Sequence, residues 1–165
     1  MAVSLPGTGV FSNNTRALQK LIAASDTFQA MCGVSTEVAA LAHVHSPEAS
    51  DREGEEDQRP RAIVIASAPQ RSKKGPGSWS NHGCSLLSIE FVAPDAFKHS
   101  PQDAFAWVLQ QLDNILLEME ATSDSRSGGY LNMTGWRTVE GPAQAIKDNE
   151  NQDDFWGVTL EVDWY

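Results

Sequence analysis

The last part of the chain, from Trp156 to Trp164, alternates apolar and polar side chains with a period of two. This is the side-chain repeat of a β-strand, so the pattern predicts a strand with one face on a core and the other in water. A chain end that is held in a sheet belongs to the fold. The residues expected to face the core are Trp156, Val158, Leu160, Val162 and Trp164.

Length and composition predict one folded domain over residues 1–165. The chain has a mass of 18.0 kDa, and 41% of its residues are hydrophobic, which is enough for a core. Its formal net charge is -10. Phosphates repel such a surface, so we do not expect it to coat nucleic acid, although DNA passing nearby is compatible with this charge.

The cysteines and the absence of long apolar segments bear on the cellular compartment. Cys32 and Cys84 are the only cysteines, which favours two reduced, buried thiols over a disulfide framework. The first residues lack the basic start and apolar run of a signal peptide, and no window approaches the length of a membrane span. We therefore expect synthesis in a reducing cytoplasm and no membrane partner.

Helical periodicity predicts three short helices near the N-terminus and one long helix later. The short helices are expected at about 15–24, 27–31 and 35–41. The long helix is expected from Pro101, which follows the N-cap residue Ser100, to about Ala121. Its inward stripe is expected to comprise Ala104, Val108, Leu112, Ile115 and Met119, widened by Phe105, Trp107, Leu109 and Leu116.

Four strands are expected, at about 62–68, 84–92, 130–139 and 155–165. Three long loops are expected between them, an acidic one at 48–61 and others at 69–82 and 141–154. The order predicts an α+β domain with a small, mainly antiparallel sheet of about four strands and the long helix packed on one face. Residues expected to be buried in the shared core are Trp107, Leu112, Ile115, Val158, Leu160 and Val162.

The residues that could carry chemistry do not form a recognisable enzyme site. His43 and His45 could share a strand face, but zinc needs two further ligands, and neither cysteine has a ligand spacing to them. Cys84 opens an apolar strand, which favours a packed thiol over a nucleophile. The acidic run that starts at Asp51 lacks the spacing of a calcium loop, and Gly75-Pro76-Gly77 lacks that of a phosphate loop. We expect no catalytic residue, no metal and no cofactor.

The segment 69–82 is the candidate site for protein contacts. It carries Arg71, Lys73, Lys74 and Trp79 among glycine, serine and proline residues. Exposed aromatic and arginine side chains are typical of contact sites between proteins. An alternative is that Trp79 folds back onto its own sheet.

The order of these segments resembles the tail terminator, or tail-completion, proteins of long-tailed bacteriophages, and the resemblance covers nearly the whole chain. The N-terminal match is the helix with Ser25-Asp26-Thr27-Phe28-Gln29-Ala30 leading to Gly33, then a histidine-bearing extended piece and an acidic linker. The later matching pieces are the strand at 61–65, the glycine-rich loop before the strand at 86–91, the long helix ending in Ile115-Leu-Leu-Glu-Met-Glu, the strand entry at 129–132, the turn at 140–142 and the final strand.

The resemblance implies a structural virion protein without catalytic residues. Such a protein forms a homo-hexameric ring that caps the tail tube, ends tail growth and joins the head connector. Its implied partners are further copies of itself, the tail tube protein and the head-tail connector protein, with DNA passing through the ring without specific binding. The implied location is the head-proximal end of the tail in the virion. The alternatives are a head-tail connector (neck or stopper) subunit and another non-enzymatic protein-binding module.

Overall fold

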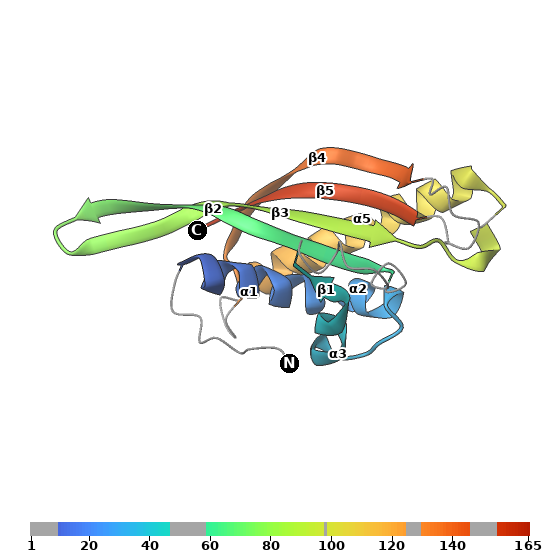
Figure 1. The fold of residues 1–165 in the computed structure, drawn as a ribbon, viewed down its shortest axis with the longest axis horizontal. Coiled ribbons are helices and arrows are strands. Elements are labelled where there is room, and N and C mark those ends of the chain that lie inside the picture. The colour runs from blue at the N-terminus through green and yellow to red at the C-terminus, as the bar shows by residue number, and fades with distance from the viewer. Residues whose placement is uncertain (1–9, 47–58, 98, 125–129, 146–154) are drawn as a thin grey trace.

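A five-stranded sheet with helices packed against it makes up the fold (Figure 1). The computed structural model describes residues 10–46, 59–97, 99–124, 130–145 and 155–165. The strand order is β1-β2-β3-β5-β4, and the α+β class is the one expected from the sequence. The strands are β1 (Val44–His45), β2 (Arg61–Gly75), β3 (Ser78–Phe91), β4 (Met133–Ala145) and β5 (Phe155–Trp164).

The sheet is mainly antiparallel, as predicted. The pairs β2–β3, β3–β5 and β4–β5 are all antiparallel, and they account for the four expected strands. The additional strand, β1, has two residues and pairs in parallel with Ala62 and Ile63 of β2. Pairing with β1 ends at Ile63, so from Val64 onward β2 is one edge strand of the described sheet, and β4 is the other edge strand.

The second and third helices each follow a residue whose side chain caps them. Ser25 accepts a hydrogen bond from the backbone N–H of Phe28, and Thr36 accepts one from Ala39, which satisfies amides that a helix start leaves unpaired. Gly33 follows the second helix at a φ of 70°, a conformation that suits glycine. The helices are α1 (Val10–Ala23), α2 (Asp26–Met31), α3 (Glu37–Ala40) and α5 (Pro101–Asp124), with 3-10 turns η1 (Leu41–His43) and η3 (Asp95–Phe97).

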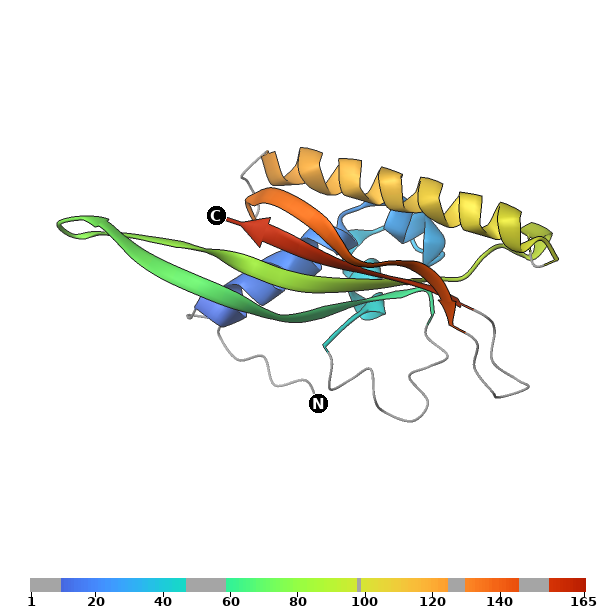
Figure 2. The same ribbon diagram turned by 90° about the horizontal axis from the view of Figure 1, so that it is seen from above.

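One hydrophobic core lies between the sheet and helices α1 and α5, which share the same sheet face (Figures 1 and 2). Direct pairing of Leu87 with Leu160 and of Ile89 with Val158 places these side chains side by side on that face. Both helices turn their apolar stripes toward them. Fully buried core residues include Leu18, Leu21, Ile22, Phe28, Val108, Ile115, Met119, Leu160 and Val162.

Five of the six residues expected in the shared core are buried, namely Leu112, Ile115, Val158, Leu160 and Val162. Trp107 is only half-buried. The buried face of α5 is centred on Val108, Ile115 and Met119, and a residue next to Val108 lies on the flank of that face. Phe105 and Leu109, expected to widen the inward stripe, are each 38% exposed and lie at its margin. The ring of Phe105 still packs 5.6 Å from that of Trp156 on β5.

The expected loops at 69–82 and 141–154 are strands in part. The first five residues of the predicted loop at 141–154 belong to β4, which continues through Gly141 and Pro142 to Ala145, and the rest of that loop lies outside the described residues. β4 is an edge strand with irregular register, and edges tolerate proline since no neighbour needs its missing N–H. The predicted acidic loop at 48–61 lies outside the described residues up to position 58. Among the described helices, none is long and apolar enough to cross a membrane.

Candidate functional site

The predicted loop at 69–82 is a β-hairpin, and we call these residues the hairpin arm. β2 and β3 stay paired from Arg61 and Glu90 out to Gly75 and Ser78. Pro76 and Gly77 connect them, and Gly77 has a φ of 74°, as position three of a Pro-Gly turn requires. Glycine, serine and proline suggested a loop, but backbone pairing does not depend on apolar side chains. The arm projects beyond the body of the protein (Figures 1 and 2).

A β-bulge lies where the arm leaves the sheet. The pairing advances from Ile65 and Leu86 to Ala68 and Cys84, so β2 carries one residue more than β3 at this point. Bulges bend a strand and increase its twist. The bulge is therefore placed where it can bend the arm relative to the rest of the sheet.

The arm contains the four predicted contact residues. The pairing of β2 with β3 places three of them, Arg71, Lys73 and Trp79, at defined positions in the arm. Lys73 is the direct cross-strand partner of Trp79, Arg71 pairs with Asn81, and Lys74 lies in a register shift near the tip. The side chain of Lys73 is exposed. The side chains of Arg71, Lys74 and Trp79 lie outside the described part of the structure, so their role stays a prediction.

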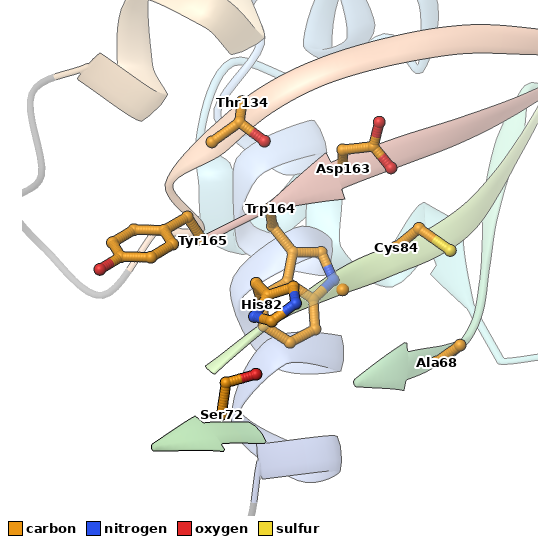
Figure 3. Close-up of a pocket in the computed structure, with 9 residues that line it drawn as sticks. Ala68, Ser72, His82, Cys84, Thr134, Asp163, Trp164 and Tyr165 are labelled. Atoms are coloured by element: carbon orange, nitrogen blue, oxygen red, sulfur yellow. The ribbon is translucent and has the colours of Figure 1, made fainter. Parts of the chain in front are cut away.

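A pocket of about 720 Å³ lies at the base of the arm (Figure 3). The strands β2, β3, β4 and β5 all contribute to its lining, because the last residues of β5 lie beside the point where the arm begins. The lining mixes polar and aromatic side chains, which suits a peptide segment as well as a small molecule. Its polar and aromatic lining residues include His82, Cys84, Thr134, Asp163, Trp164 and Tyr165.

The Cys84 thiol in this pocket is not set up as a nucleophile. A hydrogen bond to Glu161 is the main cause that raises the pKa of Cys84, and partial burial adds to it. A nucleophilic cysteine needs the opposite shift, because the thiolate is the reactive form. Cys84 was expected to be a packed thiol, yet it is half-buried and faces a pocket. Burial alone raises the pKa of Cys32 to about 12.

A charged cluster crosses the open face of the sheet beside the pocket. Arg137 of β4 lies 2.6 Å from Glu161 and 3.7 Å from Asp163, both on β5. The hydrogen bond from Cys84 is the main cause that lowers the pKa of Glu161, and the hydrogen bond from Arg137 is the second. The Arg137 side chain is 60% exposed, so water screens these pairs and they add little stability.

A second charged cluster on the open face is largely buried. The Nε atoms of Arg59 and Arg61 lie 3.0 and 2.5 Å from Oε2 of Glu90. The guanidinium of Arg59 also stacks 3.9 Å from the ring centre of Phe155. The three charged side chains are at most 13% exposed, and such a cluster fixes geometry more than it stabilises.

The histidines do not assemble with other ligands in the described structure. His43 ends η1, and its Nδ1 lies 3.2 Å from the carbonyl oxygen of Pro60. His45 lies in β1, two residues further on. Among the residues that the structure describes, no group of three or more His, Cys, Asp or Glu side chains is placed to hold a metal ion.

Sequence reasoning missed an exposed surface on α5. Phe105, Leu109 and Leu117 are 38%, 38% and 63% exposed, and Asp113 lies between them in the sequence. These four residues are spaced by four, so they form one ridge on the helix, which we call the α5 ridge. The spacing itself was visible in the sequence, but which flank the sheet leaves open is a tertiary property.

The sequence matches no protein-family model, and it matches no curated protein.

Proposed function

We propose that this chain is a ring-forming structural protein that caps the tail tube of a long-tailed bacteriophage, ends tail growth and provides the junction to the head connector. The proposal assigns it no catalytic residue and no cofactor. Its partners are further copies of the chain, the tail tube protein and the connector protein.

The hairpin arm is the observation that carries the proposal. Three of the 12 basic residues of the chain and none of its 22 acidic residues lie in the arm. The arm extends away from the body (Figures 1 and 2), and the side chain of Lys73 is exposed on it. A charged projection on an oppositely charged body is suited to steering and orienting a protein contact.

The distribution of surfaces also supports an assembly role. A head-to-tail ring needs two different surfaces that match each other. The arm supplies one surface at one end of the molecule, and α5 and β4 supply exposed apolar residues elsewhere, including Leu117, Trp136 and Val139. The net charge of -10 fits a ring through which DNA passes without sticking, because like charges repel.

Negative-stain electron microscopy of the purified protein, alone and with isolated tail tubes, tests this proposal. We expect closed rings with sixfold symmetry, at least on the tube ends. Cross-linked tails with any other stoichiometry at the head-proximal end contradict the ring. Failure of the purified protein to assemble on isolated tail tubes contradicts the proposal as a whole.

The runner-up is a head-tail connector subunit, which the same arm and body would also suit. The two roles differ in which half of the virion retains the protein. Tails purified from cells that make no heads carry a terminator, whereas DNA-filled heads purified from cells that make no tails carry a connector. Immunodetection of the chain on these two preparations separates them.

A further inference from the structure

The surface formed by the α5 ridge and the adjoining part of β4 has the properties of a receptor. Leu117 and Trp136, two large apolar side chains, are 63% and 41% exposed. The indole N–H of Trp136 donates a 2.9 Å hydrogen bond to Glu120 of α5, so the helix and the edge strand form one continuous surface. Exposed apolar surface with charged neighbours is typical of contact sites.

A hollow lies between α5 and β4 in this surface. It has a volume of about 420 Å³, and its lining includes Glu120, Met133 and Trp136. A carboxylate beside an aromatic wall suits a ligand that combines a positive charge with an aromatic ring, because the charge pairs with Glu120 and the ring packs on Trp136.

The helix that carries the ridge is strongly acidic. Its sequence contains five acidic residues and no lysine or arginine. Asp113 lies within the ridge and Glu120 beside it, and both side chains are exposed. The segment with the complementary chemistry is the hairpin arm, which has Arg71, Lys73 and Lys74 together with Trp79.

The arm cannot satisfy this match within its own molecule. In both views the arm points away from the body, whereas α5 lies along the body, with its C-terminal end on the side of the arm's base (Figures 1 and 2). A second copy is therefore the occupant that fits. An arm of one copy on the ridge of the next is a head-to-tail contact, which closes into a ring when the rotation between copies allows it.

We propose that the α5 ridge, with Glu120 and Trp136, is the receptor for the hairpin arm of a neighbouring copy of this chain. The inference rests on the proposed ring and names the contact that builds it. The contact is made by side chains rather than by pairing of strand edges, because β4 has three register shifts and contains Pro142, which interrupt its free edge.

Charge exchange between the two surfaces tests the proposal. An arm variant carries Arg71→Glu, Lys73→Glu and Lys74→Glu, and a ridge variant carries Asp113→Lys and Glu120→Lys. Neither variant alone is expected to form rings on tail tubes or in concentrated solution. One chain that carries both sets restores the attraction and is expected to regain rings.

A mixture of the arm variant and the ridge variant has a distinctive expected result. Each variant repels itself, but both contacts between the two variants match: the intact arm of the ridge variant on the intact ridge of the arm variant, and the reversed arm on the reversed ridge. We therefore expect mixed rings in which the two variants alternate, and no rings from either variant alone. The matched control carries Asp103→Lys and Glu140→Lys, which make the same change in charge at exposed sites outside the ridge. This control is expected to assemble like the unmodified chain.

A photo-reactive residue in place of the exposed Pro76 at the arm tip maps the contact directly and leaves Gly77 with its positive φ intact. Cross-links to the α5 peptide of another copy support the proposal. Cross-links confined to another surface, to the tube protein or to the same copy overturn it, as do normal rings from the ridge variant. If the unmodified chain forms no rings even on tubes, the proposed function fails first. If the unmodified chain and the ridge variant both form normal rings, only this inference is contradicted.

Discussion

Glu118 of α5 accepts a 2.5 Å hydrogen bond from the hydroxyl of Ser25, the N-cap residue of α2, across 93 positions of sequence. The same carboxylate accepts bonds of 2.6 and 3.0 Å from the hydroxyl and the backbone N–H of Thr27. One side chain of the long helix therefore holds the start of a short one. The contact fixes α2 against α5, and it depends on Glu118 being charged.

The charge of Glu118 predicts a pH dependence. Burial opposes its ionisation, but the hydrogen bonds from Ser25, Thr27 and the backbone of Asp26 outweigh burial and lower its pKa below 4.5. As the pH falls, Glu118 is protonated at a higher pH in the unfolded chain than in the folded chain. Its contribution to the free energy of unfolding is therefore full above pH 4.5 and is lost as the pH falls through the lower pKa of the folded state. Denaturant titrations of the unmodified chain and Glu118→Gln should differ at neutral pH and converge in acid. A constant difference across this range contradicts the prediction.

Replacing Glu90 tests the buried charged cluster. Glu90→Gln removes the carboxylate between Arg59 and Arg61 and leaves two nearly buried cations close together. We expect a loss of about 1.5–3 kcal/mol in the free energy of unfolding, because charge-assisted hydrogen bonds in a nearly buried place are lost. Glu161→Gln, the matched change in the exposed pair with Arg137, should alter stability little. Equal effects of the two substitutions would show that burial does not govern these pairs.

Truncation of core leucines should be costly. Leu160 is fully buried and Leu112 is 6% exposed, and both lie in the core between α5 and the sheet. Either Leu→Ala change should lower the free energy of unfolding by roughly 2–5 kcal/mol, through lost burial and the cavity left behind. Val38→Ala is the control, because Val38 is 80% exposed. An unchanged denaturation midpoint for Leu160→Ala would refute the face assigned to β5.

The Cys84 thiol should become more reactive when its acceptor is neutralised. Glu161→Gln removes the charge that raises the pKa of Cys84, so the pKa should fall toward 9.0. More thiolate is then present at a given pH, and alkylation by iodoacetamide should be faster. The rate measured against pH should shift to lower pH in the variant. Cys32, with its pKa near 12, serves as the internal reference and should stay slow in both proteins.

Changes in the hairpin arm should affect assembly and spare folding. Reversal of Arg71, Lys73 and Lys74 to glutamate, or Trp79→Ala, alters an extension outside the core. The thermal unfolding midpoint should therefore stay close to that of the unmodified chain. Phage that carry either change should make tails of uncontrolled length or tails that fail to join heads, as seen by microscopy. Normal infectious particles from the combined variant would refute a docking role for the arm.

Local patterns in the sequence were sufficient to locate several elements. The alternation from Trp156 to Trp164 located β5 and its buried face, because a side-chain period of two has one structural solution. The Ser100-Pro101 start and the apolar stripe located α5. The capping role of the Ser25 region was also legible, since a helix start needs a side-chain acceptor.

The length of the strands and the identity of the exposed surfaces depend on contacts between distant parts of the chain. The arm and the end of β4 are strands because a neighbouring backbone pairs with them, and polar composition conceals such pairing. The partners of Glu118 lie more than 90 positions away, so no local pattern reveals them. Phe105, Leu109 and Leu117 have the periodicity of core residues. The sheet covers mainly another flank of α5, although the ring of Phe105 still packs 5.6 Å from that of Trp156 on β5. Which flank is covered depends on the packing of the whole core.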